Sequence, residues 1–405
     1  MAGNLRDRLK MIQGRKSAPA AERSSACADS ERISALESFG WESCGFQTLK
    51  RVIIADSPFR AKGRLPPALA IVVPDLAGRK LPKIEDFLFF DLETTGLSGG
   101  AGTVAFLAAF GRMVSGKLHI TQYLLLDYPG ENDFLEASLS QFKNENSVIV
   151  TYNGKSFDSQ ILKTRCLMNG IKPPEYYHAD LLHPARRLWK NVIGDCSQGS
   201  IETRILGLDR SGDIPGALAP EIWFEFLKTG KHERLMGICD HNISDITGLS
   251  SILSAMISIA AAPFDSQYHY DLERLALYWR DFVRFEESSD LQRAGGRLLH
   301  LAVQQKYPRA CYVYASDQLR GGREDEGRKG LLDISESDFP QNIKAAALRA
   351  LAIDSERRLK DSAEALMFAK QGLAFVPEGA WHLEFERRVQ RLERKETTNN
   401  TNKRE

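Results

Sequence analysis

The chain has 405 residues, and its 54 Lys and Arg residues nearly balance its 53 Asp and Glu residues, for a formal net charge of +1. Its length predicts two or three domains, and its 43% hydrophobic and 26% charged residues are typical of globular proteins. Together these values exclude a wholly disordered chain, a collagen-like chain, a coiled-coil rod and a nucleic-acid binder that acts through bulk positive charge.

Six cysteines are spread along the chain without a CxxC pair, which is typical of reduced thiols and not of a disulfide framework or a zinc site. The basic stretch 1–20 lacks the apolar core of a signal peptide. The most apolar long segment, 249–262, is shorter than the roughly 20 residues that a membrane-spanning helix needs. We therefore expect a cytoplasmic protein with no membrane partner.

The N-terminal part divides into two segments. Residues 1–35 are rich in Ala, Ser, Arg and Glu and predict a flexible basic arm. Residues 36–84 begin with the apolar stretch 39–56, where one or two strands should form, and continue into a Pro-rich run that favours extended connections. We expect 36–84 to pack as an extended segment on the domain that follows.

Strand patterns dominate after this segment. An apolar run at 87–90 leads into the next motif, and two strand-like stretches, 103–114 and 118–127, flank a Ser-Gly turn that predicts an antiparallel hairpin. A helical pattern at 131–144 precedes the apolar strand 147–153. This order predicts a mixed sheet flanked by helices. Further helical patterns lie at 156–169, 183–191, 219–229 and 232–259.

The strand signal ends beyond Pro263. Helical periodicity then recurs in several stretches, interrupted by a charged, Gly-rich stretch at 319–330 that predicts a loop. The helical stretches are 270–288, 291–307, 342–354 and 362–376.

The strongest chemical signal is the sequence DLETTGL at 91–97. Residues i and i+2 of a strand share a face, so Asp91 and Glu93 present two carboxylates together at a strand end. Adjacent carboxylates repel each other unless one is protonated or a divalent cation lies between them, and oxygen ligands suit Mg²⁺ or Mn²⁺. Taken alone, the pair fits a solvated strand end before a polar turn equally well.

Two further elements each add an acid. Asp158 lies in the first turn of a helix predicted to start near Ser156, where an acid also simply faces the helix dipole. His241 and Asp245 are four residues apart and therefore share a helical face. Such His–Asp pairs are also common on exposed helix surfaces.

The motifs DLETTG, NxxxFD and HxxxD occur in this order along about 155 residues. As a set they resemble the DEDD superfamily of 3′–5′ exonucleases on an RNase H-like fold, and in particular its YprB-like branch, a bacterial family with a C-terminal tetratricopeptide-type region. The stretches 178–189 and 196–223 also look like that branch. The resemblance implies an α/β RNase H-like exonuclease domain at 85–262, followed by an all-α tetratricopeptide-like region at 263–392. The polar tail 393–405 is expected to be disordered.

The resemblance also implies an activity: phosphodiester hydrolysis at single-stranded DNA or RNA 3′ ends, with two divalent cations, Mg²⁺ or Mn²⁺. A histidine with an ordinary pKa near 6.5 is mostly neutral at neutral pH and able to accept a proton from water. The implied residues are Asp91, Glu93, Asp158 and Asp245 as metal ligands, His241 as general base, and Thr94, Thr95, Leu97, Asn153 and Lys155 as nucleic-acid contacts.

The spacing of the histidine departs from the pattern of the histidine subclass of this superfamily. There the base stands five positions before the last aspartate, whereas His241 stands four before Asp245, which is the spacing of the tyrosine subclass. Because four residues keep both side chains on one helical face, catalysis by His241 stays feasible. A second metal site formed by His178, Asp180 and His183 is the less favoured interpretation of that segment, and the role of Asp180 stays open.

The C-terminal helices allow two interpretations. Ala365, Ala369 and Pro377 match the small-residue and proline positions of a tetratricopeptide-type helix pair, whose repeat is about 34 residues. The region is therefore either a groove for a protein partner or a helical bundle.

Two alternatives to an exonuclease also stand. One is a catalytically weak or inactive nucleic-acid-binding adaptor that recruits partners through the helical region. The other is an RNase H-type endonuclease with the same metal chemistry. The presence of all four acids disfavours the adaptor, and the DLETTG and HxxxD motifs disfavour the endonuclease.

Overall fold

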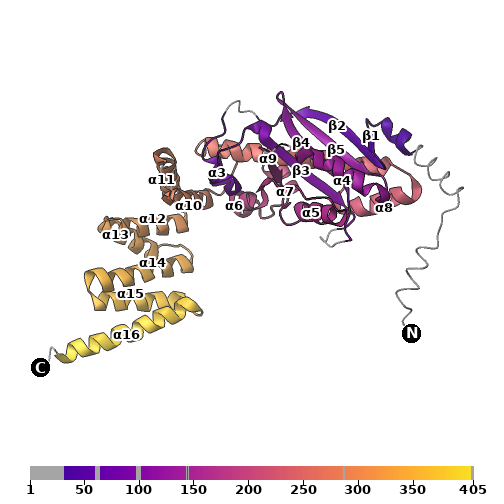
Figure 1. Cartoon of the computed structure of the whole chain (residues 1–405). Helices are drawn as coiled ribbons and strands as arrows, with labels where there is room; N and C mark the ends of the chain where they lie inside the picture. The colour runs from indigo at the N-terminus through magenta and orange to yellow at the C-terminus, as the bar shows by residue number, and fades with distance from the viewer. Residues whose placement is uncertain are drawn as a thin grey trace, which may run out of the picture. The chain divides into compact units, whose positions relative to one another are not determined.

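The computed structural model (Figure 1) consists of two units that divide after Ala262, with residues 266–269 belonging to the first unit. The domain boundary expected at 262/263 stays a prediction. Of the N-terminal arm expected at 1–35, residues 1–31 lie outside the described part of the chain. The described residues are 32–59, 64–96, 102–142, 144, 146–285 and 288–402.

A seven-stranded mixed sheet organises the first unit, in the order β1-β2-β5-β4-β3-β6-β7. In the sheet, the neighbouring strands β1, β2, β5, β4 and β3 pair antiparallel. Strand β6 runs parallel to β3, and β7 runs parallel to β6. The predicted α/β fold with a mixed sheet is confirmed. The strands are β1 (Glu42–Gly45), β2 (Thr48–Asp56), β3 (Phe87–Thr94), β4 (Ala105–Val114), β5 (Lys117–Leu125), β6 (Val148–Thr151) and β7 (Tyr177–Asp180).

The β4–β5 hairpin forms at the predicted turn. Val114 pairs with Lys117, and Ser115 and Gly116 both have positive φ, 50° and 81°. Two residues of positive φ match the right-handed twist of the flanking strands. The hairpin predicted from the Ser-Gly pair is therefore confirmed.

The segment 36–84 belongs to the sheet, which corrects the expectation of an extended segment packed on a domain starting at 85. Strand β2 pairs with β5 along its whole length, from Thr48 opposite Leu125 to Asp56 opposite Lys117. Its backbone thereby satisfies an edge of β5 that would otherwise be unpaired. The sheet and the first unit therefore begin well before residue 85.

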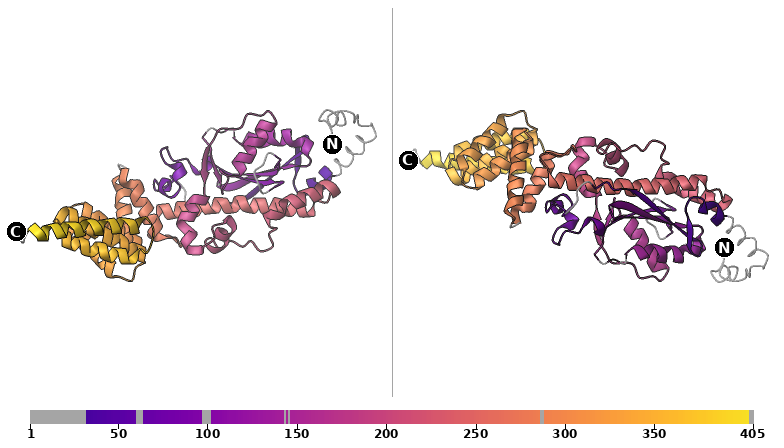
Figure 2. Two further views of the ribbon diagram at one scale, coloured as in Figure 1. Left: turned by 90° about the horizontal axis from the view of Figure 1, so that it is seen from below. Right: turned by 90° about the horizontal axis from the view of Figure 1, so that it is seen from above.

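Helix α9 (Glu233–Ala261) packs along β3, β4 and β5 on one face of the sheet (Figure 2). By length and composition alone it is apolar enough to cross a membrane, but 61% of its most apolar window is buried inside the protein. Its apolar face therefore belongs to the core of this unit. The other main helices of the unit are α4 (Glu131–Leu139), α5 (Asp158–Met168), α6 (Leu182–Ile193), α7 (Gln198–Arg204) and α8 (Ala219–Thr229).

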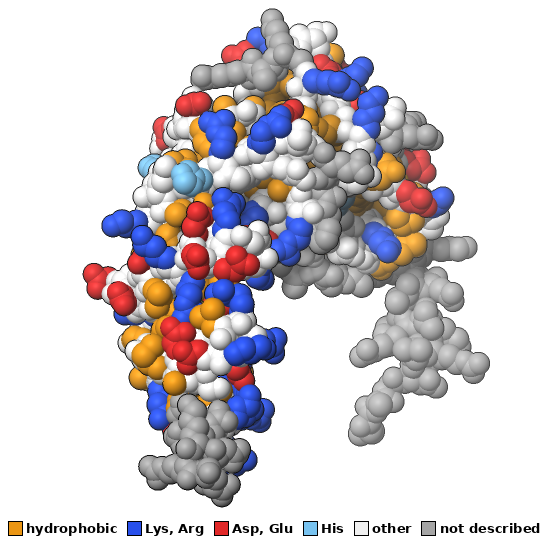
Figure 3. Space-filling model, turned by 90° about the vertical axis from the view of Figure 1, so that its left-hand side faces the viewer, with side chains coloured by type: hydrophobic (Ala, Val, Ile, Leu, Met, Phe, Trp, Pro, Cys, Tyr) orange, Lys and Arg blue, Asp and Glu red, His pale blue; other side chains and the backbone are white. Residues whose placement is uncertain are grey.

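The second unit is helical, as predicted, and successive helices pack on one another. On the face drawn in Figure 3, acidic and basic side chains lie among each other, which agrees with the near-zero net charge. The tetratricopeptide-type repeat stays a prediction. The helices are α10 (Leu272–Phe282), α11 (Ser289–Gln304), α12 (Pro308–Arg320), α13 (Glu324–Glu336), α14 (Gln341–Asp354), α15 (Ser362–Phe375) and α16 (Ala380–Asn402).

Two expectations for this unit are wrong. Most of the predicted loop 319–330 is helical, because α13 begins at Glu324 with acids in its first turn, where they favour the helix dipole. A Cβ at Gly327 would lie 2.3 Å from the Leu319 backbone nitrogen, so this glycine permits close helix packing. Of the tail predicted to be disordered at 393–405, residues 393–402 continue α16, which Leu392 anchors in the last apolar cluster. Residues 403–405 lie outside the described part of the chain.

Candidate active site

Two carboxylates of the site come from β3, at the end where its apolar run stops. Residues on this strand alternate between faces: Phe90 stacks on Phe110 on one side, whereas Asp91 and Glu93 face α9. The Asn242 side chain on α9 donates a hydrogen bond from Nδ2 to Asp91 Oδ2 at 2.7 Å. Asp91 is thereby held in the space between the sheet and α9, and Glu93 lies 4.0 Å from His241 on the same helix.

The third carboxylate, that of Asp158, follows β6, the parallel neighbour of β3. Because β6 runs parallel to β3, the carboxyl ends of the two strands lie next to each other. Beyond β6 the chain turns through Asn153, whose φ of 65° is left-handed, a conformation that asparagine tolerates better than most residues. Helix α5 then begins at Asp158, and this turn delivers its buried carboxylate to the end of β3.

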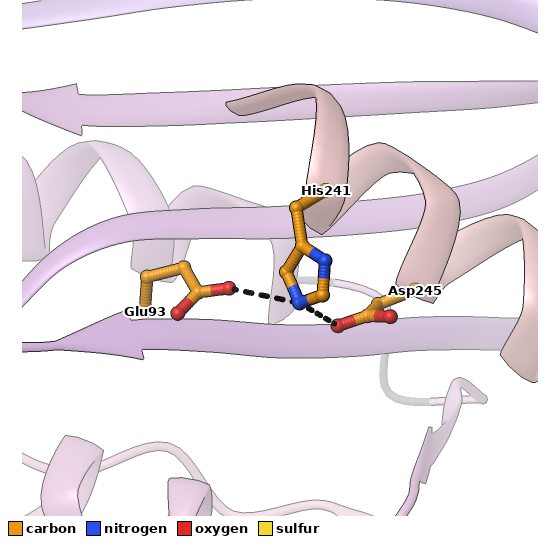
Figure 4. A group of neighbouring side chains, drawn as sticks. All are labelled: Glu93, His241 and Asp245. Carbon is orange, nitrogen blue, oxygen red and sulfur yellow. Dashed lines mark ion pairs between the residues drawn. The ribbon is translucent and has the colours of Figure 1, made fainter. Parts of the chain in front are cut away.

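Helix α9 supplies the remaining predicted residues, His241 and Asp245, one turn apart (Figure 4). The Nε2 atom of His241 lies 3.2 Å from Asp245 Oδ2 and 4.0 Å from Glu93 Oε1. One ligand atom from each of these three residues fits within 4.8 Å of the others. The three side chains therefore converge on one point.

A single pocket of about 250 Å³ brings the predicted catalytic residues together. It is lined by all four predicted metal-binding acids and by His241, and also by Thr94 and Asn153 of the predicted nucleic-acid contacts. The three motifs, far apart along the chain, thus meet in one place.

The crowded carboxylates have strongly shifted pKa values. Burial, followed by the charges of Asp245 and Asp158, raises the pKa of Asp91 well above its ordinary value. Burial also raises the pKa of Glu93 to about 8 and that of Asp158 to about 7, with neighbouring carboxylates adding to both shifts. A divalent cation would remove this repulsion. The oxygen-rich donor set therefore fits Mg²⁺ or Mn²⁺.

His241 differs from the expectation of a mostly neutral histidine. Burial alone would lower its pKa, but the hydrogen bond to Asp245 and the carboxylates of Asp245 and Glu93 raise that pKa to about 9. In the cation-free site the imidazole is therefore protonated at pH 7. A bound cation would offset the carboxylate charge and so lower this pKa.

Comparison with known proteins agrees with this architecture. Residues 88–257 match the family RNase_H_2, described as RNase_H superfamily. The chain is also 32% identical over 296 residues to the uncharacterized protein YprB of Bacillus subtilis (strain 168), covering 71% of this chain and 69% of YprB. The chain belongs to the YprB family.

The match to the RNase_H superfamily identifies residues 88–257 of the first unit as an RNase H-like nuclease superfamily domain. Among solved structures, the family B DNA polymerase from the hyperthermophilic archaeon Pyrobaculum calidifontis aligns with a TM-score of 0.34 and 15% identity. That alignment covers 50% of this chain and 30% of the polymerase chain.

The residues predicted to contact nucleic acid in this YprB-family chain differ from one another in their hydrogen-bond and ion-pair partners. The Thr94 hydroxyl donates to the Gly96 carbonyl at 2.8 Å, and the Thr95 hydroxyl accepts from the Val104 N–H at 2.9 Å. The hydroxyls of both threonines are therefore engaged by backbone groups near the end of β3. Lys155 forms an ion pair with Asp75 at 2.5 Å. Leu97 lies outside the described residues.

Asp180 supports the turn that carries Asp158. Its carboxylate accepts backbone hydrogen bonds from Asn153 at 2.8 Å, Lys155 at 3.0 Å and Leu182 at 3.0 Å. The alternative of a second metal site at His178, Asp180 and His183 gains no support, because these residues do not form a converging ligand group in the described part of the chain.

Three polar residues of the site were not predicted from the sequence motifs: Arg210, Asp213 and Asn242. Asp213 Oδ1 lies 2.9 Å from His241 Nδ1, and Arg210 Nη2 lies 2.7 Å from Asp245 Oδ1. Arg210 and Asp213 stand in the connection between α7 and α8, where no spacing links them to His241. Asn242 directly follows His241, and this position is the one clue that the sequence gives to its role. The helical period alone would place the two side chains on different faces of α9.

Proposed function

We propose that this chain is a metal-dependent 3′–5′ exonuclease that hydrolyses phosphodiester bonds at single-stranded nucleic-acid ends. The observation that carries this proposal is the convergence of four carboxylates and one histidine in a single pocket at the end of β3. The direction of cleavage and the preference for chain ends rest on the motif set, which resembles that of the DEDD exonucleases.

Asp91, Glu93, Asp158 and Asp245 would hold two divalent cations, Mg²⁺ or Mn²⁺. When bound, such ions neutralise the charge of the scissile phosphate, lower the pKa of an attacking water and stabilise the leaving oxygen. The raised pKa values of Asp91, Glu93 and Asp158 support this assignment, because they reflect a concentration of negative charge that a cation would offset.

His241 would accept a proton from the attacking water at Nε2, the ring nitrogen nearest Glu93 and Asp245. The same two carboxylates keep this nitrogen protonated when no cation is present, since they raise the pKa of His241 to about 9. A neutral base is therefore expected only when the carboxylate charge is offset. This coupling confines base catalysis to the cation-loaded site.

Digestion of 5′-labelled single-stranded DNA and RNA tests the proposal. Purified full-length protein with Mg²⁺ or Mn²⁺ should produce a ladder that shortens from the 3′ end, and chelation or Asp91→Asn should abolish it. Asp209→Asn is the matched control, because Asp209 is exposed and, among the described residues, its side chain bonds Ser211.

The other outcomes of this assay favour the alternatives. Cuts that first appear inside the strand would favour an endonuclease. Tight binding of both substrates without cleavage, in either metal, would favour the adaptor. The two labelled substrates also distinguish DNA from RNA, since the phosphodiester chemistry is common to both.

A further inference from the structure

The connection between α7 and α8, residues 205–218, reaches His241 at three positions. Asp213 Oδ1 lies 2.9 Å from the Nδ1 atom of His241. Arg210 Nη2 lies 3.3 Å from the same nitrogen. A Cβ at Gly216 would lie 2.9 Å from the other ring nitrogen, Nε2, so only a glycine leaves space for the ring there.

The chemistry of the two partners decides which contact at Nδ1 orients the ring. Arg210 Nη2 donates to Asp245 Oδ1 at 2.7 Å and forms an ion pair with Asp213 Oδ2 at 2.7 Å. Its approach to His241 Nδ1, at 3.3 Å, is longer than that of Asp213 Oδ1, at 2.9 Å. A guanidinium only donates and a carboxylate only accepts. The shorter contact therefore requires a proton on Nδ1, with this nitrogen as the donor and Asp213 Oδ1 as its acceptor.

A buried anchor holds Arg210 in this position. Its Nη1 atom forms an ion pair with Glu202 Oε2 at 2.9 Å, and Glu202 is fully buried. The Glu202 carboxylate fits against α9 only because Gly248 has no side chain: a Cβ there would lie 1.7 Å from Glu202 Oε1. Gln198 donates to the same carboxylate oxygen at 2.8 Å. The anchor is therefore built from α7 and α9 together.

We infer that Asp213 is a positioning residue for His241, and that Arg210 fixes Asp213 in turn. Asp213 keeps the proton of neutral His241 on Nδ1, so the lone pair of Nε2 faces the pocket that Glu93 and Asp245 line. This inference rests on the proposed function, because it gives Nε2 its task as the proton acceptor. A carboxylate behind the far nitrogen is a general way to orient a functional imidazole.

The same arrangement bears on the unusual spacing of the histidine. A base four residues before the last aspartate lies on the same helical face as that aspartate, so the two side chains compete for one direction. Arg210 binds Asp245 Oδ1, and Asp213 draws Nδ1 of His241 to its own side. These loop residues thereby bind Asp245 Oδ1 and His241 Nδ1, and they leave Asp245 Oδ2 and His241 Nε2 on the side of the pocket.

The test compares full-length wild type with Asp213→Asn, which keeps the side-chain volume but removes the charge that holds the Nδ1 proton. With histidine labelled by ¹⁵N, and the His241 signals identified by their loss in His241→Gln, the Mg²⁺-loaded wild type should show the Nδ1–H form. Asp213→Asn should shift the neutral ring toward the Nε2–H form. Asp209→Asn should leave the His241 signals unchanged.

Activity gives the second readout. Asp213→Asn should lower kcat by about 10- to 100-fold, the range seen when the partner behind a metal-binding histidine is removed, with KM within about twofold. A merely structural role would change both parameters and leave the tautomer of His241 alone. Unchanged His241 signals in Asp213→Asn would overturn the inference, as would an unchanged kcat in an active enzyme.

Failure of the proposed function gives a different pattern. If wild type cleaves neither DNA nor RNA, the exonuclease proposal fails. The ¹⁵N comparison still decides whether Asp213 sets the tautomer, because it requires no turnover. Asp213→Ala repeats the comparison without an amide that could itself bond to Nδ1, and loss of the Nδ1–H form there supports the positioning role.

Discussion

Asn242 on α9 joins the site to the core through Asp91, to which its Nδ2 atom donates at 2.7 Å. The orientation of the amide is set from behind, since Gln122 on β5 donates to Asn242 Oδ1 at 2.8 Å. Gln122 in turn accepts from Arg51 Nε at 2.7 Å. This buried chain of polar groups crosses from β2 through β5 to α9 and β3. It makes the position of Asp91, a proposed metal ligand, depend on the sheet.

We expect Asn242→Ala to reduce stability and cation binding together. The change removes the Asn242 partner of Asp91 Oδ2 and of Gln122 Nε2, which keeps its bond to the Cys239 carbonyl. An unsatisfied buried polar group costs about 1–3 kcal/mol. Denaturant unfolding of the full chain measures the first effect, and Mn²⁺ titration measures the second. Asn132→Ala on the exposed face of α4 is the control. Wild-type stability in Asn242→Ala would show that the buried chain contributes nothing.

Removing a site carboxylate should separate activity from stability. Asp158→Asn should lower exonuclease activity by at least about 100-fold, comparable to the loss of one electrostatic group in other active sites. Its cation-free melting temperature should stay equal or rise, because Asp158 is a buried acid among like charges that raise its pKa to about 7. Parallel nuclease and thermal-melting assays check both effects. A marked loss of cation-free stability would contradict the repulsion argument.

The cation-free protein should become less stable as pH rises. Glu93 and Asp158 have folded pKa values of about 8 and about 7, above their unfolded values of about 4.3 and 3.9. The folded state therefore holds more protons in this window, and stability falls as pH rises through it. His241, with a folded pKa of about 9, acts in the same direction: its contribution is lost as pH rises from about 6.5 through 9.

Cation binding should reverse this trend. A cation displaces the protons of the site carboxylates, so the gain in melting temperature on adding Mg²⁺ or Mn²⁺ should be larger at pH 8 than at pH 5.5. Thermal melting at both pH values, with cation and with chelator, checks this difference. An equal gain at both pH values would mean that the cation does not compete with these protons.

In the helical unit, one carboxylate should make stability fall as pH decreases, which is the opposite of the trend expected at the site. The hydrogen bond from Arg391, together with the charges of Arg388 and Lys395, lowers the pKa of Glu356 to about 2. This carboxylate stabilises the fold above its unfolded pKa of about 4.3, and the contribution is lost as pH falls from about 4.5 to about 2.

At neutral pH, Glu356→Gln should therefore destabilise this unit by on the order of 1 kcal/mol. Hydrogen exchange of α16 in the full chain measures the effect, with Glu378→Gln as the exposed control. Faster exchange that is the same at pH 7 and pH 2.5 would show that the charge of Glu356 is not its cause.

Local patterns in the chain paired the acids of the candidate site, and the resemblance of the whole motif set to the DEDD exonucleases gave those acids their expected role. A period of two on β3 puts Asp91 and Glu93 on one face, and a separation of four on α9 does the same for His241 and Asp245. These relations depend on backbone geometry alone, which is why sequence spacing reveals them. The hairpin turn at 115–116 is local in the same sense.

Contacts between distant segments were decided only by the tertiary structure. The pairing of β2 with β5, the hydrogen bond between Asn242 and Asp91, and the contact of Asp213 with His241 join residues that no local period relates. Asp180 shows the same limit. From the sequence its carboxylate is a candidate ligand, whereas in the structure it accepts hydrogen bonds from backbone N–H groups. Periodicity fixes the face on which a side chain lies, whereas the group that it meets there depends on how the elements pack.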